Sequence, residues 1–110
     1  MRTQLLPFTA LLVLSIFVLP VEIHAQSDTA KTFKANCELC HGADGSGNTG
    51  PGKAFHAQDL RSSDTQKQTD AQLAQVIAKG REKMPAFGAK LKPEEIEKLV
   101  TYVRTLAPRK

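Results

Sequence analysis

The sequence of 110 residues predicts a small all-α domain with three main helices and one glycine-rich loop. Three segments carry apolar residues at the three- and four-residue spacing of an amphipathic helix. No segment shows the strict alternation of apolar and polar residues that is typical of a half-buried strand. Five glycines lie between residues 42 and 52, so this stretch separates the first helical segment from the second.

The first predicted helix begins near Ser27 or Asp28 and ends at Gly42. Ser27 is a favourable N-cap residue, and an acidic side chain in the first turn complements the positive end of the helix dipole. Phe33 and Cys37 lie four residues apart, so we expect them to share an inward-pointing face.

Residues 42–52 are predicted to form a loop, because glycine, asparagine, aspartate and Pro51 all favour turns. Two interpretations of the glycines stay open. They allow the backbone to approach a cofactor edge closely, since glycine lacks a Cβ atom, or they belong to an ordinary flexible surface loop. After this stretch we expect a short irregular turn, with Leu60 pointing inward.

The other two helices have clear boundaries in the sequence. Thr69 and Gln72 form a capping box at the start of the second helix, and Gly80 ends it. The third helix begins at Pro93, which is favoured in a first turn, and ends before Pro108. Each has one apolar face, formed by Leu73, Val76 and Ile77 in the second and by Ile96, Leu99, Val100, Val103 and Leu106 in the third.

Residues 1–25 have the pattern of a secretion signal peptide. A basic residue precedes an apolar run from Leu5 to Val21, and Ala25 is a suitable small residue before the cleavage point. We therefore expect a mature domain of residues 26–110. The alternative is an uncleaved N-terminal membrane anchor, although two prolines shorten the apolar run.

Both cysteines of the chain lie in the motif Cys37-Glu38-Leu39-Cys40-His41. This spacing predicts the attachment of a c-type haem. Two thiols one helical turn apart can each form a thioether with a haem vinyl group, and His41 can then ligate the iron. The thin core agrees with a haem at its centre. Residues 26–110 contain four aromatic residues, and so small a domain rarely buries enough apolar surface without a cofactor or another staple.

Other uses of the two cysteines stay open at this point. After export, Cys37 and Cys40 could form a disulfide. They could also act as a redox-active dithiol, although thioredoxin-like folds need a βαβ pattern that this sequence lacks. A zinc site needs further ligands, and His56 is the only other histidine in residues 26–110.

Met84 is the candidate for a second iron ligand. It is the only methionine besides Met1, and it lies in an irregular segment between Gly80 and Gly88. A thioether opposite histidine raises the reduction potential of haem. Two alternatives remain: Met84 fills a gap in the core, as methionine usually does, or His56 is the ligand instead of an exposed loop residue.

These motifs make the chain similar to the class I cytochromes c, and in particular to the short bacterial and photosynthetic soluble members. The resemblance rests on the Cys37–His41 motif and on the segment Lys83-Met84-Pro85-Ala86-Phe87. It extends from Thr29 to Leu106. It implies the class I cytochrome c fold, wrapped around one covalently bound haem c.

The resemblance also implies roles for individual residues. Cys37 and Cys40 would hold the haem, and His41 and Met84 would be its two metal ligands. The carbonyl group of Pro51 would accept a hydrogen bond from His41, which fixes the orientation of the imidazole ring.

The first and last helices would cross as they do in this family, with Phe33 against Leu99 and Tyr102. The chain departs from the family at Thr29, where a glycine usually stands eight residues before the first cysteine. We therefore expect a slightly wider crossing. The chain also has no tryptophan, the residue that many larger members use to hold a haem propionate.

The predicted function is that of a periplasmic electron carrier without substrate turnover, because an iron with two protein ligands leaves no open position. The expected partners are an upstream dehydrogenase or quinol-oxidising complex and a downstream oxidase or reductase. One alternative is a dedicated cytochrome subunit that accepts electrons from a specific periplasmic dehydrogenase or oxidoreductase. Another is a gas- or peroxide-reactive haem protein, which requires Met84 to dissociate.

The formal net charge is +4, and loss of residues 1–25 leaves it unchanged because one basic and one acidic residue are lost. Lys53, Arg81, Lys83 and Lys90 are expected to border the haem crevice, where they would attract acidic partners. The alternative is that these residues only keep the protein soluble. We do not expect nucleic-acid binding, because no basic cluster is interleaved with aromatic residues.

Overall fold

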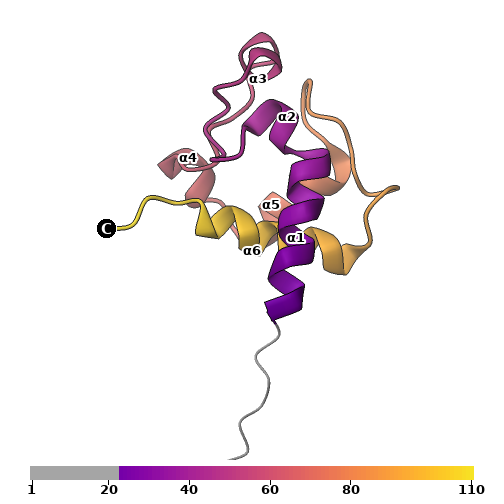
Figure 1. Cartoon of the computed structure of the whole chain (residues 1–110). Coiled ribbons are helices and arrows are strands. Elements are labelled where there is room, and N and C mark those ends of the chain that lie inside the picture. Colours follow the sequence, from indigo (N-terminus) through magenta and orange to yellow (C-terminus); the bar gives the residue numbers. More distant parts are fainter. Residues whose placement is uncertain (1–22) are drawn as a thin grey trace, which may run out of the picture.

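The computed structural model describes residues 23–110, which form six α-helices and no strand (Figure 1). The helices are α1 (Ile23–Asn36), α2 (Glu38–His41), α3 (Gly50–Ala54), α4 (Ser63–Gln66), α5 (Asp70–Lys79) and α6 (Pro93–Thr105). This confirms the all-α prediction. Within residues 23–110, no helix is both long and apolar enough to cross a bilayer. The predicted signal peptide lies almost entirely outside the described residues, and cleavage after Ala25 stays a prediction.

Helix α1 begins at Ile23, so the predicted start near Ser27 was wrong. No proline or glycine interrupts the chain between these two positions, and the helix continues upstream of the favourable cap. The Thr29 hydroxyl donates a hydrogen bond to the Ala25 carbonyl oxygen at 2.9 Å within this extension. At the other end, Gly42 adopts a φ of 79° and ends α2, as predicted.

The glycine-rich stretch contains a short helix, α3, where a loop was predicted. Pro51 lies in its first turn, and the Gly52 N–H donates to the Thr49 hydroxyl oxygen at 2.9 Å. An N-cap followed by proline is a helix start signal, which the glycine content obscured. Helix α4 was also missed, and the Ser62 hydroxyl oxygen caps it by accepting from the Thr65 N–H at 3.3 Å.

Helices α5 and α6 begin where the sequence predicted. At α5, the Gln72 N–H donates to the Thr69 hydroxyl at 3.1 Å, and the Thr69 N–H donates to the Gln72 side chain at 2.8 Å. At α6, the Lys92 N–H donates to the Glu95 carboxylate at 2.8 Å. Gly80 ends α5. These contacts satisfy amide groups that have no partner inside their helices.

The core lies where α1 crosses α6 (Figure 1). Phe33 and Leu99 are each 1% exposed, and the Phe33 and Tyr102 rings pack with centroids 4.8 Å apart. The predicted meeting of these three residues is confirmed. Thr29 is also buried here, beside a crevice of about 190 Å³ between the two helices. Thr29 therefore fits into the crossing of α1 and α6, and a small crevice stays open beside it.

Arg104 ties α6 to the connection between α4 and α5. Its guanidinium donates to the carbonyl oxygens of Gln66 at 2.8 Å and Gln68 at 2.5 Å, and to the Asp70 carboxylate at 2.8 Å. The Gln66 side chain in turn donates to the carbonyl oxygens of Leu60 at 2.7 Å and Val103 at 3.0 Å. These bonds hold residues 60–70 against α6, and this stretch forms one side of the cavity described next.

Candidate functional site

A cavity of about 410 Å³ opens between α2, the loop after α3, helix α5 and the segment that follows α5. This volume lies within the range of cofactor pockets in proteins. The cavity brings together Cys37, Cys40, His41 and Met84, and His56 also lies on its wall. Pro51 is not part of the wall. Most of the remaining lining is apolar, including Leu60, Leu73, Val76, Ile77, Phe87 and Val103.

Helix α2 and its N-cap residue Cys37 present the two cysteines and the histidine to this cavity. The Cys37 N–H donates to the Phe33 carbonyl oxygen at 2.8 Å, so the motif follows α1 with little break. The His41 N–H donates to the Cys37 carbonyl oxygen at 2.9 Å. One helical turn therefore separates Cys37 from both Cys40 and His41, as two thioether bonds and an iron ligand on one ring require.

The surroundings of Cys37 do not match those of a redox-active dithiol. The thiols are free, and burial raises the pKa of Cys37 to about 11. Redox-active dithiols have a lowered thiol pKa instead, since the thiolate is the reactive form. No group of three or more potential metal-binding His, Cys, Asp or Glu residues occurs within residues 23–110, so the zinc interpretation gains no ligands.

The imidazole of His41 is oriented by a backbone carbonyl group. Its Nδ1 lies 2.9 Å from the Gln58 carbonyl oxygen, which can only accept, so Nδ1 carries the proton and Nε2 is the nitrogen available to a metal. Burial lowers the pKa of His41, and this hydrogen bond offsets part of the effect. Burial therefore favours the neutral ring, which is the form that binds metals.

The predicted contact between His41 and Pro51 is not made in this structure. The Pro51 carbonyl oxygen accepts from the Phe55 N–H at 2.9 Å, because Pro51 lies inside α3 and its carbonyl is used by that helix. Gln58 takes its place. Sequence reasoning missed Gln58 because the acceptor is a backbone oxygen, which any residue would supply.

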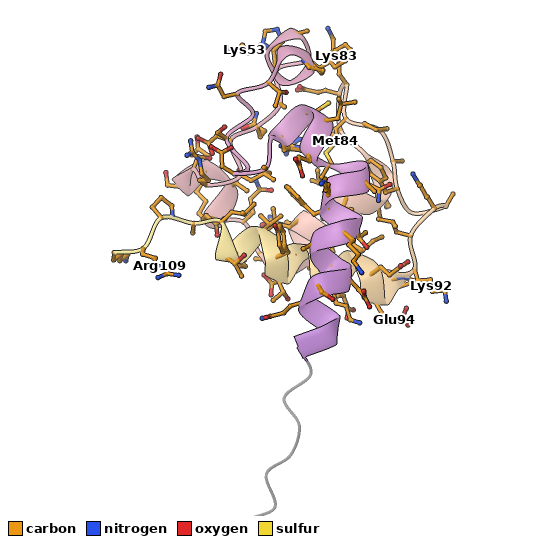
Figure 2. The ribbon with its side chains drawn as sticks, in the orientation of Figure 1. Lys53, Lys83, Met84, Lys92, Glu94 and Arg109 are labelled. Carbon is orange, nitrogen blue, oxygen red and sulfur yellow. The ribbon has the colours of Figure 1, made fainter. Side chains whose placement is uncertain are left out.

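Met84 lies on the irregular segment between α5 and α6 and is partly buried (Figure 2). The segment returns to α5 through the Phe87 N–H, which donates to the Ile77 carbonyl oxygen at 3.0 Å. Gly80 begins the segment with a φ of 72°, and a Cβ atom there would meet the Met84 carbonyl oxygen closely. The backbone around Gly80 therefore holds Met84 at the cavity.

The outer end of the cavity combines exposed apolar and basic side chains. Leu39 is 73% exposed and Phe55 is 52% exposed, and both line the cavity. Lys53 and Lys83 lie at the same end of the molecule (Figure 2). Of the four basic residues expected to border the crevice, Arg81 and Lys83 line it, whereas Lys53 and Lys90 do not.

The donor set fits a covalently held porphyrin. Two free thiols, an imidazole and a thioether line a largely apolar space. A porphyrin needs apolar walls, and its iron accepts nitrogen and sulfur ligands.

Comparison with known proteins finds relatives of this chain. Residues 24–103 match the family model described as "Cytochrome C oxidase, cbb3-type, subunit III". The chain is 36% identical over 88 residues to the cbb3-type cytochrome c oxidase subunit FixP of Azorhizobium caulinodans. The matched residues are 79% of this chain and 29% of FixP. It is also 40% identical over 78 residues to cytochrome c6 of Nostoc sp., and the matched residues are 67% of this chain and 64% of that protein.

Other matches span nearly the whole of the compared protein. Cytochrome c6 of Gracilaria tenuistipitata var. liui is 30% identical over 99 residues, which are 87% of this chain and 89% of that protein. The solved structure of the KustC0563 c-type cytochrome has a TM-score of 0.67 at 33% identity and covers 73% of this chain and 98% of that one.

Fold and site together define a small helical protein that binds haem covalently. The chain belongs to the class I cytochromes c, in the family described as "Cytochrome C oxidase, cbb3-type, subunit III". The chain spans 29% of FixP and 64% of the Nostoc cytochrome c6, less than two thirds of either protein. The cofactor of this chain is haem c, and Cys37 and Cys40 fit the attachment motif.

Proposed function

We propose that this protein is a periplasmic electron carrier with one haem c, attached through Cys37 and Cys40 and ligated by His41 and Met84. The observation that carries the proposal is the convergence of these four side chains on one cavity from the α1–α2 junction, α2 and the segment after α5. The two candidate iron ligands come from parts of the chain more than forty residues apart.

The haem, when bound, supplies a reversible one-electron change at its iron. The Gln58 carbonyl fixes the His41 ring so that Nε2 can face the metal. Met84 offers a neutral, soft sulfur atom, which favours the reduced iron and raises the potential. The apolar part of the wall limits the access of water, and solvent access is one of the factors that set the reduction potential of haem.

A Met84→Ala variant tests the ligand assignment. We expect it to lose the weak methionine-to-iron absorption of the ferric protein and to lower the reduction potential, because the sulfur ligand is gone. His56→Ala is the matched control, since His56 lines the same cavity. The assignment is wrong if Met84→Ala changes neither the absorption nor the potential, or if His56→Ala changes both.

We further propose that acidic redox partners dock at the exposed end of the cavity. Leu39 and Phe55 would form an apolar centre, with Lys83 and Arg81 beside it. Charge of this sign steers negatively charged partners and speeds their encounter. The rate of electron transfer to an acidic partner should therefore fall as ionic strength rises. A rate that does not depend on salt would remove the steering proposal.

A dedicated cytochrome subunit is the second candidate, favoured by the description of the matching family and by FixP. Stable co-purification with one oxidoreductase supports this candidate, whereas isolation as a free monomer that several partners oxidise supports the shuttle. The gas- or peroxide-reactive alternative predicts CO binding to the reduced protein at neutral pH, which firm ligation by Met84 should prevent.

The periplasmic location follows from the proposed signal peptide. The intact mass of the purified protein should correspond to a chain that begins at Gln26, with one haem added. A membrane-bound product that begins at Met1 would support the N-terminal anchor instead.

A further inference from the structure

The segment that carries Met84 contains a strained two-residue turn. The Arg81 N–H donates to the Met84 carbonyl oxygen at 3.2 Å, and the Met84 N–H donates to the Arg81 carbonyl oxygen at 2.9 Å. Glu82 and Lys83 are the two residues at the tip. Glu82 has a φ of 53°, in the left-handed region. Turns with this conformation at the first central position normally place glycine there. The strain therefore lies two residues before Met84.

A contact at the edge of the cavity favours the closed turn, whereas the strain favours its opening. The Lys83 ammonium nitrogen lies 5.8 Å from the centre of the Phe55 ring, within the range of a cation–π interaction. Phe55 directly follows α3, so the contact joins the Met84 segment to the part of the cavity lining next to α3. The base of the segment is fixed separately by hydrogen bonds to α5 from Phe87 and Gly88. Lys83 and Phe55 thus restrain its tip.

We propose that this turn is a latch that sets how firmly Met84 stays on the iron and how readily a small external ligand replaces it. Strain at Glu82 is relieved when the turn opens, and the Lys83–Phe55 contact is lost when it opens. The strain at Glu82 therefore favours release of Met84, and the Lys83–Phe55 contact favours its retention. Glu82, Lys83 and Phe55 are positioning residues, and the proposal rests on the ligand role of Met84 proposed above.

The two effects are of similar size. A left-handed conformation costs an ordinary residue about 5- to 30-fold in population. Glycine removes that cost. It also has more conformational freedom in the open turn, and this freedom favours the open turn by about two- to fivefold. We therefore expect Glu82→Gly to weaken the binding of imidazole to the ferric protein by about two- to fivefold. Loss of the exposed cation–π contact in Lys83→Gln should strengthen that binding by about two- to fivefold.

The test titrates imidazole into the ferric holoprotein and follows the methionine-to-iron absorption. Glu82→Ala removes the same charge as Glu82→Gly but keeps the Cβ atom and therefore the strain, so its imidazole affinity should match the wild type. Lys34→Gln removes a positive charge from α1, away from the cavity lining, and should also match the wild type.

The latch is overturned if Glu82→Gly and Glu82→Ala have the same affinity, because charge rather than strain would then explain the effect. It is also overturned if Glu82→Gly and Lys83→Gln change the midpoint of unfolding but not the imidazole affinity. Failure of the ligand proposal has a different signature: the absorption would survive in Met84→Ala. The latch and the ligand assignment can therefore fail separately.

Discussion

Gly52 occupies the most crowded backbone position next to the haem-binding motif. It is buried in α3, and a Cβ atom there would lie under 3.0 Å from the carbonyl oxygens of Cys40 and Gly47. Both neighbours are backbone atoms. The Cys40 carbonyl belongs to α2, so it cannot move without displacing the attachment residues. Gly52→Ala should therefore strain the site as well as the fold.

The expected loss can be set against the stability of the whole domain. Overpacking a close-fitting site costs about 1–3 kcal/mol, and more where the backbone must shift. We expect Gly52→Ala to reduce the free energy of unfolding by about 3 kcal/mol, because two backbone oxygens obstruct the new methyl group. A domain of this size has roughly 5–10 kcal/mol in total. The variant should lose about a third or more of its stability.

Gly50→Ala is the matched control, two residues earlier in the same helix. A Cβ atom at Gly50 would meet nothing within 4 Å. Because alanine favours helix more than glycine, this variant should keep its stability or gain up to about 1 kcal/mol. Guanidinium unfolding of each holoprotein, followed by circular dichroism, gives the comparison. Equal midpoints for the two variants would refute the close approach of α2 and α3.

Two further substitutions test contacts away from the cavity. Arg104→Met should lower the free energy of unfolding by about 1–3 kcal/mol, since it removes hydrogen bonds to two carbonyl oxygens and to a carboxylate; a loss no larger than that of Lys98→Met on the same helix would contradict this. Arg61→Gln should raise the pKa of Asp59, which the hydrogen bond from Arg61 holds below 3.8, and a carboxyl titration followed by NMR measures it. The Asp59–Arg61 pair stabilises the fold above pH 3.8 and loses that effect as the pH falls through the pKa of Asp59 in the folded protein. An unchanged Asp59 pKa in the variant would contradict this pairing.

The sequence predicted those parts of the fold whose signals are local. The capping box at Thr69 and the proline at position 93 mark real helix starts, because these signals are local. The capping bonds of Thr69 with Gln72 and of Lys92 with Glu95 each span three residues. The starts of α1 and α3 were harder to predict. A good cap at Ser27 does not end a helix that can continue upstream, and the glycines around Pro51 outweighed its helix-starting role.

The candidate site divides in the same way. Cys37, Cys40, His41 and Met84 were all predicted from side-chain chemistry, and all four line one cavity. The predicted partner of His41, the Pro51 carbonyl, was wrong, because that carbonyl is used inside α3. The Gln58 carbonyl is the partner instead, and a backbone carbonyl leaves no mark in the sequence. The left-handed conformation of Glu82 also has no sequence signal, since glutamate rarely adopts it.

The pyridine haemochrome spectrum of the purified, exported protein tests the haem attachment most directly. It distinguishes a haem whose two vinyl groups have become thioethers from one whose vinyl groups are intact. We expect the spectrum of a haem bound through both Cys37 and Cys40. The spectrum of a haem with free vinyl groups, or a protein that contains no haem, would contradict covalent attachment at this motif.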